Sequence, residues 1–575
     1  MKNKIISRFM AMMIGMALIS MPLSALADGP GQDMPSQDQS RQSSVSWSGA
    51  TTITQAGTYD SKTYSSSTKD ENAVLITATG GVTLTNPTVT KTGDGASSDN
   101  YSFYGINSAV MCKDGTQTTI TGGSISTSAD GANAVFSYGG YATTDNTNTD
   151  GTTVVISDTT INTTGDGSGG IMTTGGGIMK AYDLTITTSG NSSAPIRTDR
   201  GGGDVDVDGG SYTSNGTGSP AIYSVTDVDI TDASVTSNKS EGAVIEGAGS
   251  IELSNTDLTG NNTNLNGNAQ FYNTVMIYQS MSGDASDGTS LFNMTNGTLT
   301  SNNGDVFHIT NTDGKVNLEG VNIINNDEDD VLLSVCDDGW DTSGQSATVN
   351  ATDQYLEGKM LVGSDSSLAL NLKGGSVFYG TTSGDITNDK NNTSVSTSLG
   401  SVSVNVESQS TFALSADTTV SSIEGSGSVY LGDYMLTVGG NTYKSGDTLP
   451  SNLTETNVVP EGATQTDDTS DVTEKKANTL KVSGKSVTVK YAKLKKKNIK
   501  IARGKAISVK NAKGEVTFTK SKGNKKILIN KNTGKLTIKK GLKKGTYTLS
   551  VKVKALGNTN YKAATKTARI RIKVV

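Results

Sequence analysis

The feature that most constrains the fold of this chain is a loose repeat of about 22–26 residues that runs through most of its length. One unit starts at Val228 and the next at Ile251, and each contains two or three short strands of alternating apolar and polar residues, separated by Gly, Asn, Asp or Ser. A single unit cannot bury its own apolar side, whereas stacked units can. The repeat predicts an all-β chain that forms a right-handed parallel β-helix, with one coil per repeat.

The N-terminus has the pattern of a secretory signal over residues 1–27. Lys2 and Lys4 precede the apolar run Phe9–Ile19, and Ala25–Ala27 has the small-x-small pattern of a cleavage site. The apolar run is short for a membrane span, and no second candidate follows. We expect an exported protein without a membrane span, secreted or loosely associated with the cell surface.

Composition divides the rest of the chain into four parts. Residues 28–44 are polar and read as a flexible leader, and the repeat occupies residues 45–449. Residues 450–477, which begin with Pro450 and continue rich in Thr, Asp and Glu, form a linker, and residues 478–575 have a different strand pattern.

The repeat spacing stretches at two places within the β-helix. These are residues 141–151 and 261–288, which we interpret as loops extruded from the stack.

Charge is distributed very unevenly along the chain. From Lys475 to Val575 there are 31 Lys and Arg residues and one acidic residue, Glu515, which gives +30. Because the whole chain carries −7, the remaining residues carry −37. This polarity marks a domain boundary.

The basic segment contains about eight short strand candidates separated by turn signals, which predicts a small antiparallel β-sandwich. Its phrases Asn532–Ile538 and Gly545–Val551 resemble the bacterial immunoglobulin-like and cadherin-like modules repeated on exported proteins. The resemblance covers about the last 100 residues. It implies a spacer or a unit associated with walls or glycans.

The large domain resembles a group of exported bacterial β-helix proteins without assigned chemistry. The phrases that carry this resemblance are Ala134–Gly140, Ser168–Met172, Ile196–Gly203, Ser219–Ser224 and Ile277–Asp284. More distantly, the expected shape is that of pectate lyases, polygalacturonases and surface adhesins. Fold analogy does not transfer activity among these proteins.

The same phrases align as one strand position in successive coils. We take as inward anchors Val135, Ile171, Ile196, Ile222, Val244, Ile277, Phe307 and Leu332. Since strand side chains alternate, the next residues face outward: Phe136, Met172, Arg197, Tyr223, Ile245, Tyr278, His308 and Leu333. Tyr138, Asp199 and Ser280 lie two positions further along.

These outward residues form a predicted external stripe that suits an extended ligand. Rings stack on sugar faces, while Arg197 and Asp199, with Arg200 beside them, bind hydroxyls or carboxylates. The candidate ligand-binding residues are Phe136, Tyr138, Arg197, Asp199, Arg200, Tyr223, Tyr278 and His308. The alternative is that long loops or the first coils cover the stripe as a second small core. A register error of one residue would exchange the two faces.

Three carboxylates on one strand face, Asp204, Asp206 and Asp208, are weak candidates for a Ca²⁺ site. Neighbouring members of such a row lie nearly 7 Å apart, too far for all three to bind one ion. The alternative is a solvated acidic strand balanced by the two preceding arginines. Residues 326–330 and 336–341 form a second weak Ca²⁺ candidate.

His308 is the only histidine, so any Ser-His-Asp or Cys-His mechanism must use it. A lone histidine in a strand is more often structural, and no nucleophile-elbow motif is present. Cys112 and Cys336 lie many coils apart and lack metal-ligand spacing, so we expect two unpaired thiols and no structural zinc site.

The sequence favours a non-catalytic, adhesin-like surface protein that contacts glycans or the cell envelope. The basic segment would bind anionic cell-wall polymers such as teichoic acids. Nucleic acid is an unfavoured partner, because aromatic stacking platforms are absent. Two alternatives stay open: a polysaccharide lyase or glycoside hydrolase acting in a groove of the β-helix, with Arg197 or Arg200 as a possible base, and a purely structural scaffold.

Overall fold

The computed structural model describes residues 45–96, 98–140, 149–280, 282–340, 345–460, 478–514, 516–531, 533–555 and 564–575. The predicted signal segment and leader lie outside these residues, as do most of the predicted loop 141–151 and most of the linker. The chain forms two compact units, residues 1–463 and 464–575. No helix in the described part of the chain is long and apolar enough to cross a membrane.

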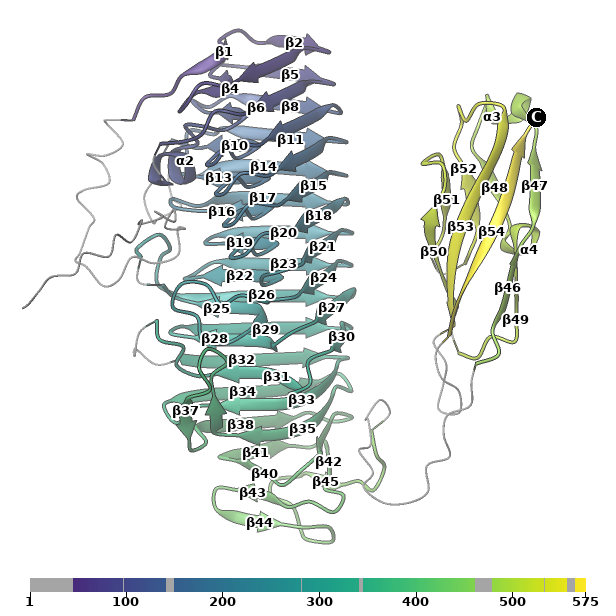
Figure 1. Ribbon diagram of the computed structural model, residues 1–575. Coiled ribbons are helices and arrows are strands. Elements are labelled where there is room, and N and C mark those ends of the chain that lie inside the picture. The colour runs from purple at the N-terminus through teal and green to yellow at the C-terminus, as the bar shows by residue number, and fades with distance from the viewer. Residues whose placement is uncertain are drawn as a thin grey trace, which may run out of the picture. The chain divides into compact units, whose positions relative to one another are not determined.

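The first unit is a stack of parallel strands in three long sheets, confirming the prediction of a parallel β-helix (Figure 1). Sheet 1 contains, in spatial order, β1 (Gly49–Ile53), β4 (Asn72–Ile76), β7 (Val110–Cys112), β10 (Val135–Tyr138), β13 (Ile171–Thr174), β16 (Ile196–Thr198), β19 (Ile222–Ser224), β22 (Ala243–Glu246), β25 (Asn273–Tyr278), β28 (Asp305–Thr310), β31 (Val331–Val335), β33 (Tyr355–Val362), β35 (Val377–Ser383), β39 (Thr411–Leu414), β42 (Ser428–Tyr430) and β45 (Thr454–Glu455).

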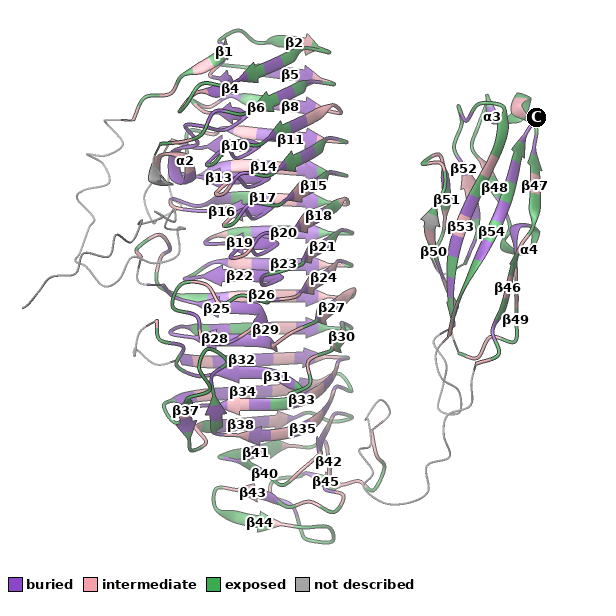
Figure 2. Ribbon diagram, in the orientation of Figure 1, coloured by how far each residue is buried: buried purple, intermediate pink, exposed green. Residues whose placement is uncertain are grey.

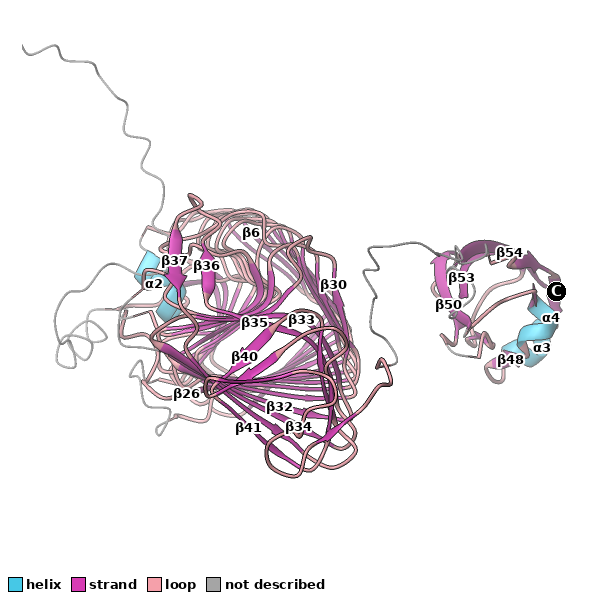
Figure 3. Cartoon of the chain, turned by 90° about the horizontal axis from the view of Figure 1, so that it is seen from below, coloured by secondary structure: helices cyan, strands magenta, loops and turns pink. Residues whose placement is uncertain are grey.

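Sheet 2 contains β2 (Gly57–Asp60), β5 (Gly81–Thr85), β8 (Gln117–Thr121), β11 (Thr153–Ser157), β14 (Gly177–Tyr182), β17 (Gly203–Asp208), β20 (Asp227–Thr231), β23 (Ser250–Ser254), β26 (Thr289–Thr295), β29 (Asp313–Glu319), β32 (Gln345–Thr352), β34 (Ser366–Lys373), β38 (Ser401–Val406) and β41 (Ser422–Gly425). Sheet 3 contains β3 (Thr63–Ser66), β6 (Thr88–Lys91), β9 (Ser124–Thr127), β12 (Thr160–Thr163), β15 (Thr185–Thr188), β18 (Ser211–Ser214), β21 (Ser234–Ser237), β24 (Asp257–Gly260), β27 (Thr298–Ser301) and β30 (Asn322–Asn325). Seen from one end of the stack, the sheets surround a continuous core (Figure 3).

The corner at the end of the sheet 2 strands is set by local sequence. The residue directly after each sheet 2 strand from β2 to β34 has a positive φ, and most of these are Asn, Asp or Gly, the residues that tolerate this conformation best. They are Ser61, Asn86, Gly122, Asp158, Asp183, Gly209, Asp232, Asn255, Asn296, Gly320, Asp353 and Gly374. One such turn per repeat is what closes each coil at the same place.

Sheet 1 differs from the other two sheets in burial. Strands of sheets 2 and 3 alternate between buried and more exposed residues, for example in β20 and β21. From β10 to β31 every residue of every sheet 1 strand is buried, as the purple strands of Figure 2 show. A sheet buried on both faces has a second layer on its outside.

Several elements outside the three sheets lie against sheet 1. Helix α2 (Ser98–Tyr104) and the antiparallel hairpin β36 (Asp385–Thr387) and β37 (Ser394–Thr397) stand outside the stack (Figure 3). The predicted loop 261–288 is partly wrong, because β25 lies within it and adds a strand to the stack. Its remaining parts, residues 261–272 and 279–288, are the segments outside the sheets.

The stack continues past residue 449, where we expected it to end. Strand β45 pairs with β42 in sheet 1. A small sheet of β40 (Thr418–Val420), β43 (Leu436–Val438) and β44 (Asn441–Tyr443) lies near this end.

The second unit consists of small sheets around its own apolar core. A four-stranded sheet has the order β47 (Ser486–Val489), β54 (Ala564–Val574), β53 (Gly545–Ala555) and β50 (Val516–Lys522), and its β47–β54 pair is parallel. The other strands are β46 (Lys481–Gly484) with β49 (Ile507–Lys510), and β48 (Ile499–Ile501) with β52 (Leu536–Ile538) and β51 (Ile527–Ile529). Two short helices, α3 (Tyr491–Leu494) and α4 (Arg503–Ala506), connect them. Strand β48 and the parallel pair were not expected from the sequence.

Candidate functional site

The predicted stripe exists as a continuous row on the outside of sheet 1, but three strands place a different residue in it: Val244 instead of Ile245, Met276 instead of Tyr278, and Ser334 instead of Leu333. Phe136, Met172, Arg197 and Tyr223 occupy the same position in successive coils, as expected. The row then continues through Val244, Met276, His308 and Ser334.

The faces assigned to Val244 and Ile245 were therefore exchanged: Val244 lies on the outside and Ile245 packs in the core. Leu333, expected outside, lies in the core, because a bulge between Val331 and Leu333 shifts the register.

The stripe is covered, so its prediction as an open ligand surface is wrong, and the alternative of a second small core is confirmed. In the first coils, Phe136, Tyr138 and Met172 pack under Phe103, Tyr104 and Ile106, with Trp47 at the edge. The Trp47 ring lies 5.5 Å from that of Tyr138, and its indole N–H donates to the Tyr104 carbonyl at 2.7 Å.

The chain approaches the stripe closely directly after α2. Gly105 has φ +62°, and a Cβ there would lie 2.7 Å from Met111 Sδ and from a Phe136 ring atom. Only glycine allows this approach.

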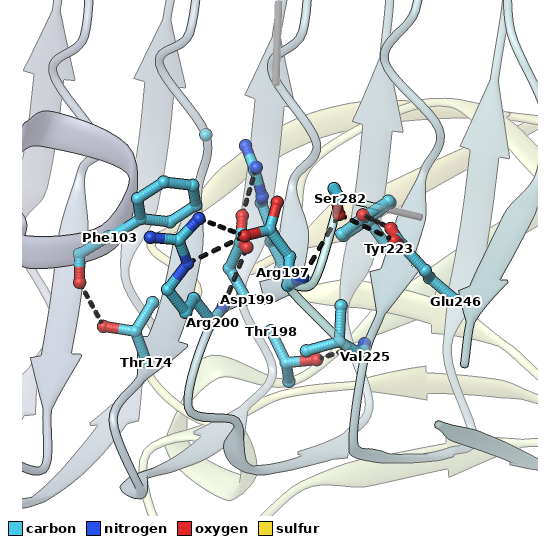
Figure 4. A network of polar contacts seen from close by, with 12 residues as sticks. Phe103, Thr174, Arg197, Thr198, Asp199, Arg200, Tyr223, Val225, Glu246 and Ser282 are labelled. Atoms are coloured by element: carbon cyan, nitrogen blue, oxygen red, sulfur yellow. Dashed lines mark hydrogen bonds and ion pairs between the residues drawn. The ribbon is translucent and has the colours of Figure 1, made fainter. Parts of the chain in front are cut away.

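Further along the stripe, a polar network lies under the loop 279–288 (Figure 4). Arg197 forms an ion pair with Asp199, and both side chains are at most 9 % exposed. Arg200 donates to Asp284 of the loop at 2.7 Å and stacks on Phe103 at 4.0 Å. The two arginines are thus committed to partners within the chain.

Glu246 is the centre of the next part of the network. Its carboxylate accepts hydrogen bonds from Tyr223, from Tyr278 at 3.0 Å, from Ser280 and from Ser282 at 3.2 Å. Burial raises the pKa of Glu246, and the hydrogen bonds from the serine and tyrosine hydroxyls oppose that rise. Burial, with Asp199 nearby, also raises the pKa of Asp284 to about 6.

His308 lies in a third buried cluster. Its Nδ1 is 2.7 Å from Ser334 Oγ, its Nε2 is 3.4 Å from Asp338 Oδ2, and Phe271 stacks on its ring at 4.9 Å. Ser334 donates in turn to Asp305. Burial lowers the pKa of His308, but Asp338 and Asp305 outweigh it and the pKa is raised; burial raises the pKa of Asp305 to about 7.

Ser334, His308 and Asp338 share the residue types of a hydrolytic triad, but their arrangement is that of a buried charge cluster. All three side chains have 0 % exposure. The Ser334 hydroxyl proton goes to Asp305, so the imidazole donates to Ser334 rather than accepting from it. A triad nucleophile needs the opposite direction and access to substrate.

The Ca²⁺ candidates are not gathered into a metal site. Asp204, Asp206 and Asp208 lie on the outer face of β17, and Lys180 pairs with Asp206 at 2.8 Å. In residues 326–341, Asp327 accepts from the Gly304 amide and Asp338 belongs to the His308 cluster. No group of three or more His, Cys, Asp or Glu residues in the described ranges could hold a metal ion.

Sequence reasoning missed an acidic patch that extends across three coils. It comprises Asp204, Asp206, Asp227, Asp229 and Glu252 on β17, β20 and β23. Burial raises the pKa of Asp229 to about 6, together with the charges of Glu252 and Asp206. The sequence signal that could have predicted this patch is the alignment of the phrases D-V-D-V-D and D-V-D-I in successive repeats.

An amide ladder continues the same row beyond the acidic patch. Asn293 donates to Glu252 at 2.9 Å, Asn317 to Asn293 at 2.6 Å, Asn350 to Asn317 at 2.7 Å and Asn371 to Asn350 at 3.0 Å. These side chains bind one another from coil to coil and stabilise the stack.

The two cysteines are unpaired and buried, as expected. Burial raises the pKa of Cys112 to about 12.

An open hollow of about 600 Å³ lies near the last coils of the first unit. Its lining is polar and lacks aromatic rings: Asn405, Glu407, Ser408, Glu424, Gly425, Ser426, Ser451 and Asn452.

In the second unit, basic side chains dominate the surface. Of the Lys and Arg residues from Lys481 onward whose surroundings the structure describes, all are exposed except Lys513, Lys520 and Lys526, which are half-buried. This unit therefore presents a strongly cationic surface to solvent.

Comparisons with known proteins give no further guidance: no family model matches the chain, nor does any curated protein or solved structure.

Proposed function

We propose that this protein is a non-catalytic binding protein of the cell exterior, attached through its basic second unit to anionic cell-envelope polymers. The single observation that carries the proposal is the charge of that unit: +30 over residues 475–575, with most of the cationic side chains that the structure describes exposed. A surface of one sign attracts polymers of the opposite sign with a strength that salt reduces. The secretory pattern at the N-terminus would bring the protein to such polymers.

The first unit supports a scaffold or display role rather than chemistry at the stripe. Arg197, Arg200 and Glu246, the residues best suited to act on a polysaccharide, are engaged with Asp199, Asp284 and the tyrosine and serine hydroxyls. Reaching them would require removal of the loop 279–288. Glycan contact, if it occurs on this unit, belongs on the open outer surfaces.

A wall-binding experiment tests the proposal. The full-length mature protein should bind purified cell walls that carry anionic polymers at low salt and be released as salt rises. A shortened chain that ends at Pro460 and keeps the acidic first unit should stay in solution. Equal binding to walls stripped of their anionic polymers would contradict the proposal and indicate a specific peptidoglycan or protein partner.

One place where the polysaccharide-cleaving alternative can be tested is the open hollow that contains Glu407 and Glu424. Glycoside hydrolysis uses two carboxyl groups about 5–9.5 Å apart. A reducing-end release assay on acidic and neutral polysaccharides, with Glu424→Gln as control, separates the two functions. Release that depends on Glu424 would establish the enzyme.

A further inference from the structure

The exposed face of the four-stranded sheet in the second unit carries cations and hydroxyls in a regular order. On β54, Arg569, Arg571 and Lys573 alternate with the buried residues Ala568, Ile570, Ile572 and Val574. On β53, Lys552 and Lys554 alternate in the same way with Val551, Val553 and Ala555. These apolar partners are buried, and all but Ala555 pack in the core of the unit, so the five cations share the solvent face.

Strand register places a hydroxyl residue beside each of the central cations. Arg571 lies between Ser486 of β47 and Thr548 of β53. Lys573 lies between Thr488 and Thr546 in the same way.

The pattern continues towards β50. Lys552 lies between Thr567 and Thr519, and Ser550 lies between Arg569 and Lys522. No two of these cations are direct cross-strand neighbours, so the face avoids the repulsion that opposed like charges would cause.

The five cations form a track in which the β53–β54 pair supplies one positive charge to each successive row: Lys573, Arg571, Arg569, Lys552 and Lys554. Successive side chains on one strand face are about 7 Å apart. Between Arg569 and Lys552 the track crosses from β54 to β53. Lys552 lies two residues after Ser550, the cross-strand partner of Arg569, so the two cations are diagonal neighbours about 7–8 Å apart.

We propose that this cation track binds a linear polyol phosphate, one phosphodiester per cation, and is the specific contact by which the protein attaches to its envelope polymer. The proposal rests on the function proposed above and assigns it to one face. Three backbone bonds of a polypeptide span at most about 3.3–3.6 Å. A polymer with six backbone bonds per repeat, such as a three-carbon polyol phosphate, therefore spans about 7 Å per repeat, matching the rows.

The hydroxyl residues make the site suited to this class of polymer. Lys and Arg neutralise the phosphate charges, while the flanking Ser and Thr groups can donate to phosphate oxygens or bind polyol hydroxyls. Single-stranded nucleic acid also has six backbone bonds per repeat, but the described residues of this face include none of the aromatic platforms on which bases stack.

The test uses the full-length mature protein and synthetic poly(glycerol phosphate) of about eight repeats. The track variant combines Arg569→Gln, Arg571→Gln and Lys573→Gln. The matched control combines Lys500→Gln, Lys525→Gln and Lys535→Gln, three exposed lysines of the β48–β52–β51 sheet and its turns with the same loss of charge. Circular dichroism and thermal melting establish that both variants are folded.

The expected results follow from counterion release. We take each phosphate contact to contribute as in single-stranded nucleic acid. The slope of log affinity against log salt is then about −3.5 for the native protein, with five contacts, and about −1.4 for the track variant, which keeps two. Affinity of the track variant at 0.1 M salt should fall on the order of 100-fold. The control should fall only a few-fold, and an Arg569→Lys, Arg571→Lys variant should bind nearly as the native protein does.

Four results would overturn the assignment. Equal losses in the track and control variants would show attraction by net charge alone, which leaves the proposed function standing. Tighter binding of an oligodeoxythymidylate than of poly(glycerol phosphate) would identify nucleic acid as the partner. Failure of the native protein to bind poly(glycerol phosphate), while it still binds anionic walls, would reject the polymer class; failure to bind both would reject the proposed function as well.

Discussion

Asp206 and Asp229 lie directly opposite each other on neighbouring coils, with like charges in register. Lys180 pairs with Asp206 at 2.8 Å, and Glu252 lies opposite Asp229 on its other side. Opposed like charges destabilise a sheet. Stacking of the coils therefore brings carboxylates together at the acidic patch, and their mutual repulsion lowers the stability of the folded protein.

The Asp229 carboxyl should make stability depend on pH. Its pKa in the folded protein is raised to about 6, above the ordinary value of 3.8. The folded state thus binds more protons than the unfolded state between these values, so the destabilisation is absent below about pH 4, grows as pH rises and is complete above about pH 6. Asp229→Asn should stabilise the protein at pH 8 by about 0.5–1 kcal/mol, a value discounted for solvent exposure.

Denaturant midpoints of native protein and Asp229→Asn at pH 8, 6 and 4 check this expectation. The gain in stability of Asp229→Asn over the native protein should vanish at pH 4. Asp208→Asn is the control, because Asp208 lies opposite Thr231 rather than a carboxylate. An equal gain from the control would mean that overall charge, not register, is responsible.

The buried pair of Arg197 and Asp199 should contribute far more to stability than the exposed pair of Lys180 and Asp206. Arg197→Ala leaves a carboxylate that is 2 % exposed without its partner, which should cost about 3–5 kcal/mol. Lys180→Ala removes a surface pair worth about 0–1 kcal/mol. Thermal melting of the two variants distinguishes them, and equal midpoints would show that the stripe is open after all.

The segment 261–272, which packs against the His308 cluster, should become less firmly held as pH rises. The pKa of His308 is raised in the folded protein. The stability that His308 contributes is therefore fully present below about pH 6.5 and is lost as pH rises through its folded-state pKa. Burial raises the pKa of Asp305 to about 7, so its ionisation also destabilises the folded cluster; this loss grows from about pH 4 and is complete above about pH 7. Both groups therefore act in the same direction.

Limited proteolysis at pH 6 and pH 9 measures this effect, with faster cleavage within residues 261–272 expected at pH 9. The His308→Gln variant should be cleaved faster than the native protein at pH 6, and its cleavage rate should change less between pH 6 and pH 9, with only the ionisation of Asp305 still contributing. A native cleavage rate that is independent of pH would show that the cluster does not hold this segment.

The two thiols should be unreactive in the folded protein. Cys112 and Cys336 are fully buried, and burial raises the pKa of both, that of Cys112 to about 12. Because the thiolate is the reactive form, a thiol reagent at pH 8 should label neither residue in native buffer and both in denaturant. Rapid labelling of Cys336 in native buffer would indicate opening of the region around Phe271 and the β36–β37 hairpin.

Much of the architecture could be predicted because its determinants are local. Alternating strands and a left-handed residue, mostly Asn, Asp or Gly, after the sheet 2 strands from β2 to β34 specify a coil, and repetition specifies the stack. The unbroken apolar character of phrases such as Val135-Phe136 was a signal that sheet 1 is buried on both faces, although alternation alone suggested an open stripe.

The parallel β-helix, the change to a basic unit and the unpaired cysteines could be predicted from sequence patterns. The cover over the stripe could not, because Arg200 contacts Asp284 and Trp340 contacts Tyr278 across many tens of residues that no periodicity relates. The tertiary structure also decided which lysines and arginines form one track, since this depends on the pairing of β53 with β54 and on which face the core occupies. Coils and turns follow from neighbouring residues, whereas a covered surface and a row of charges follow from contacts that form only when distant segments meet.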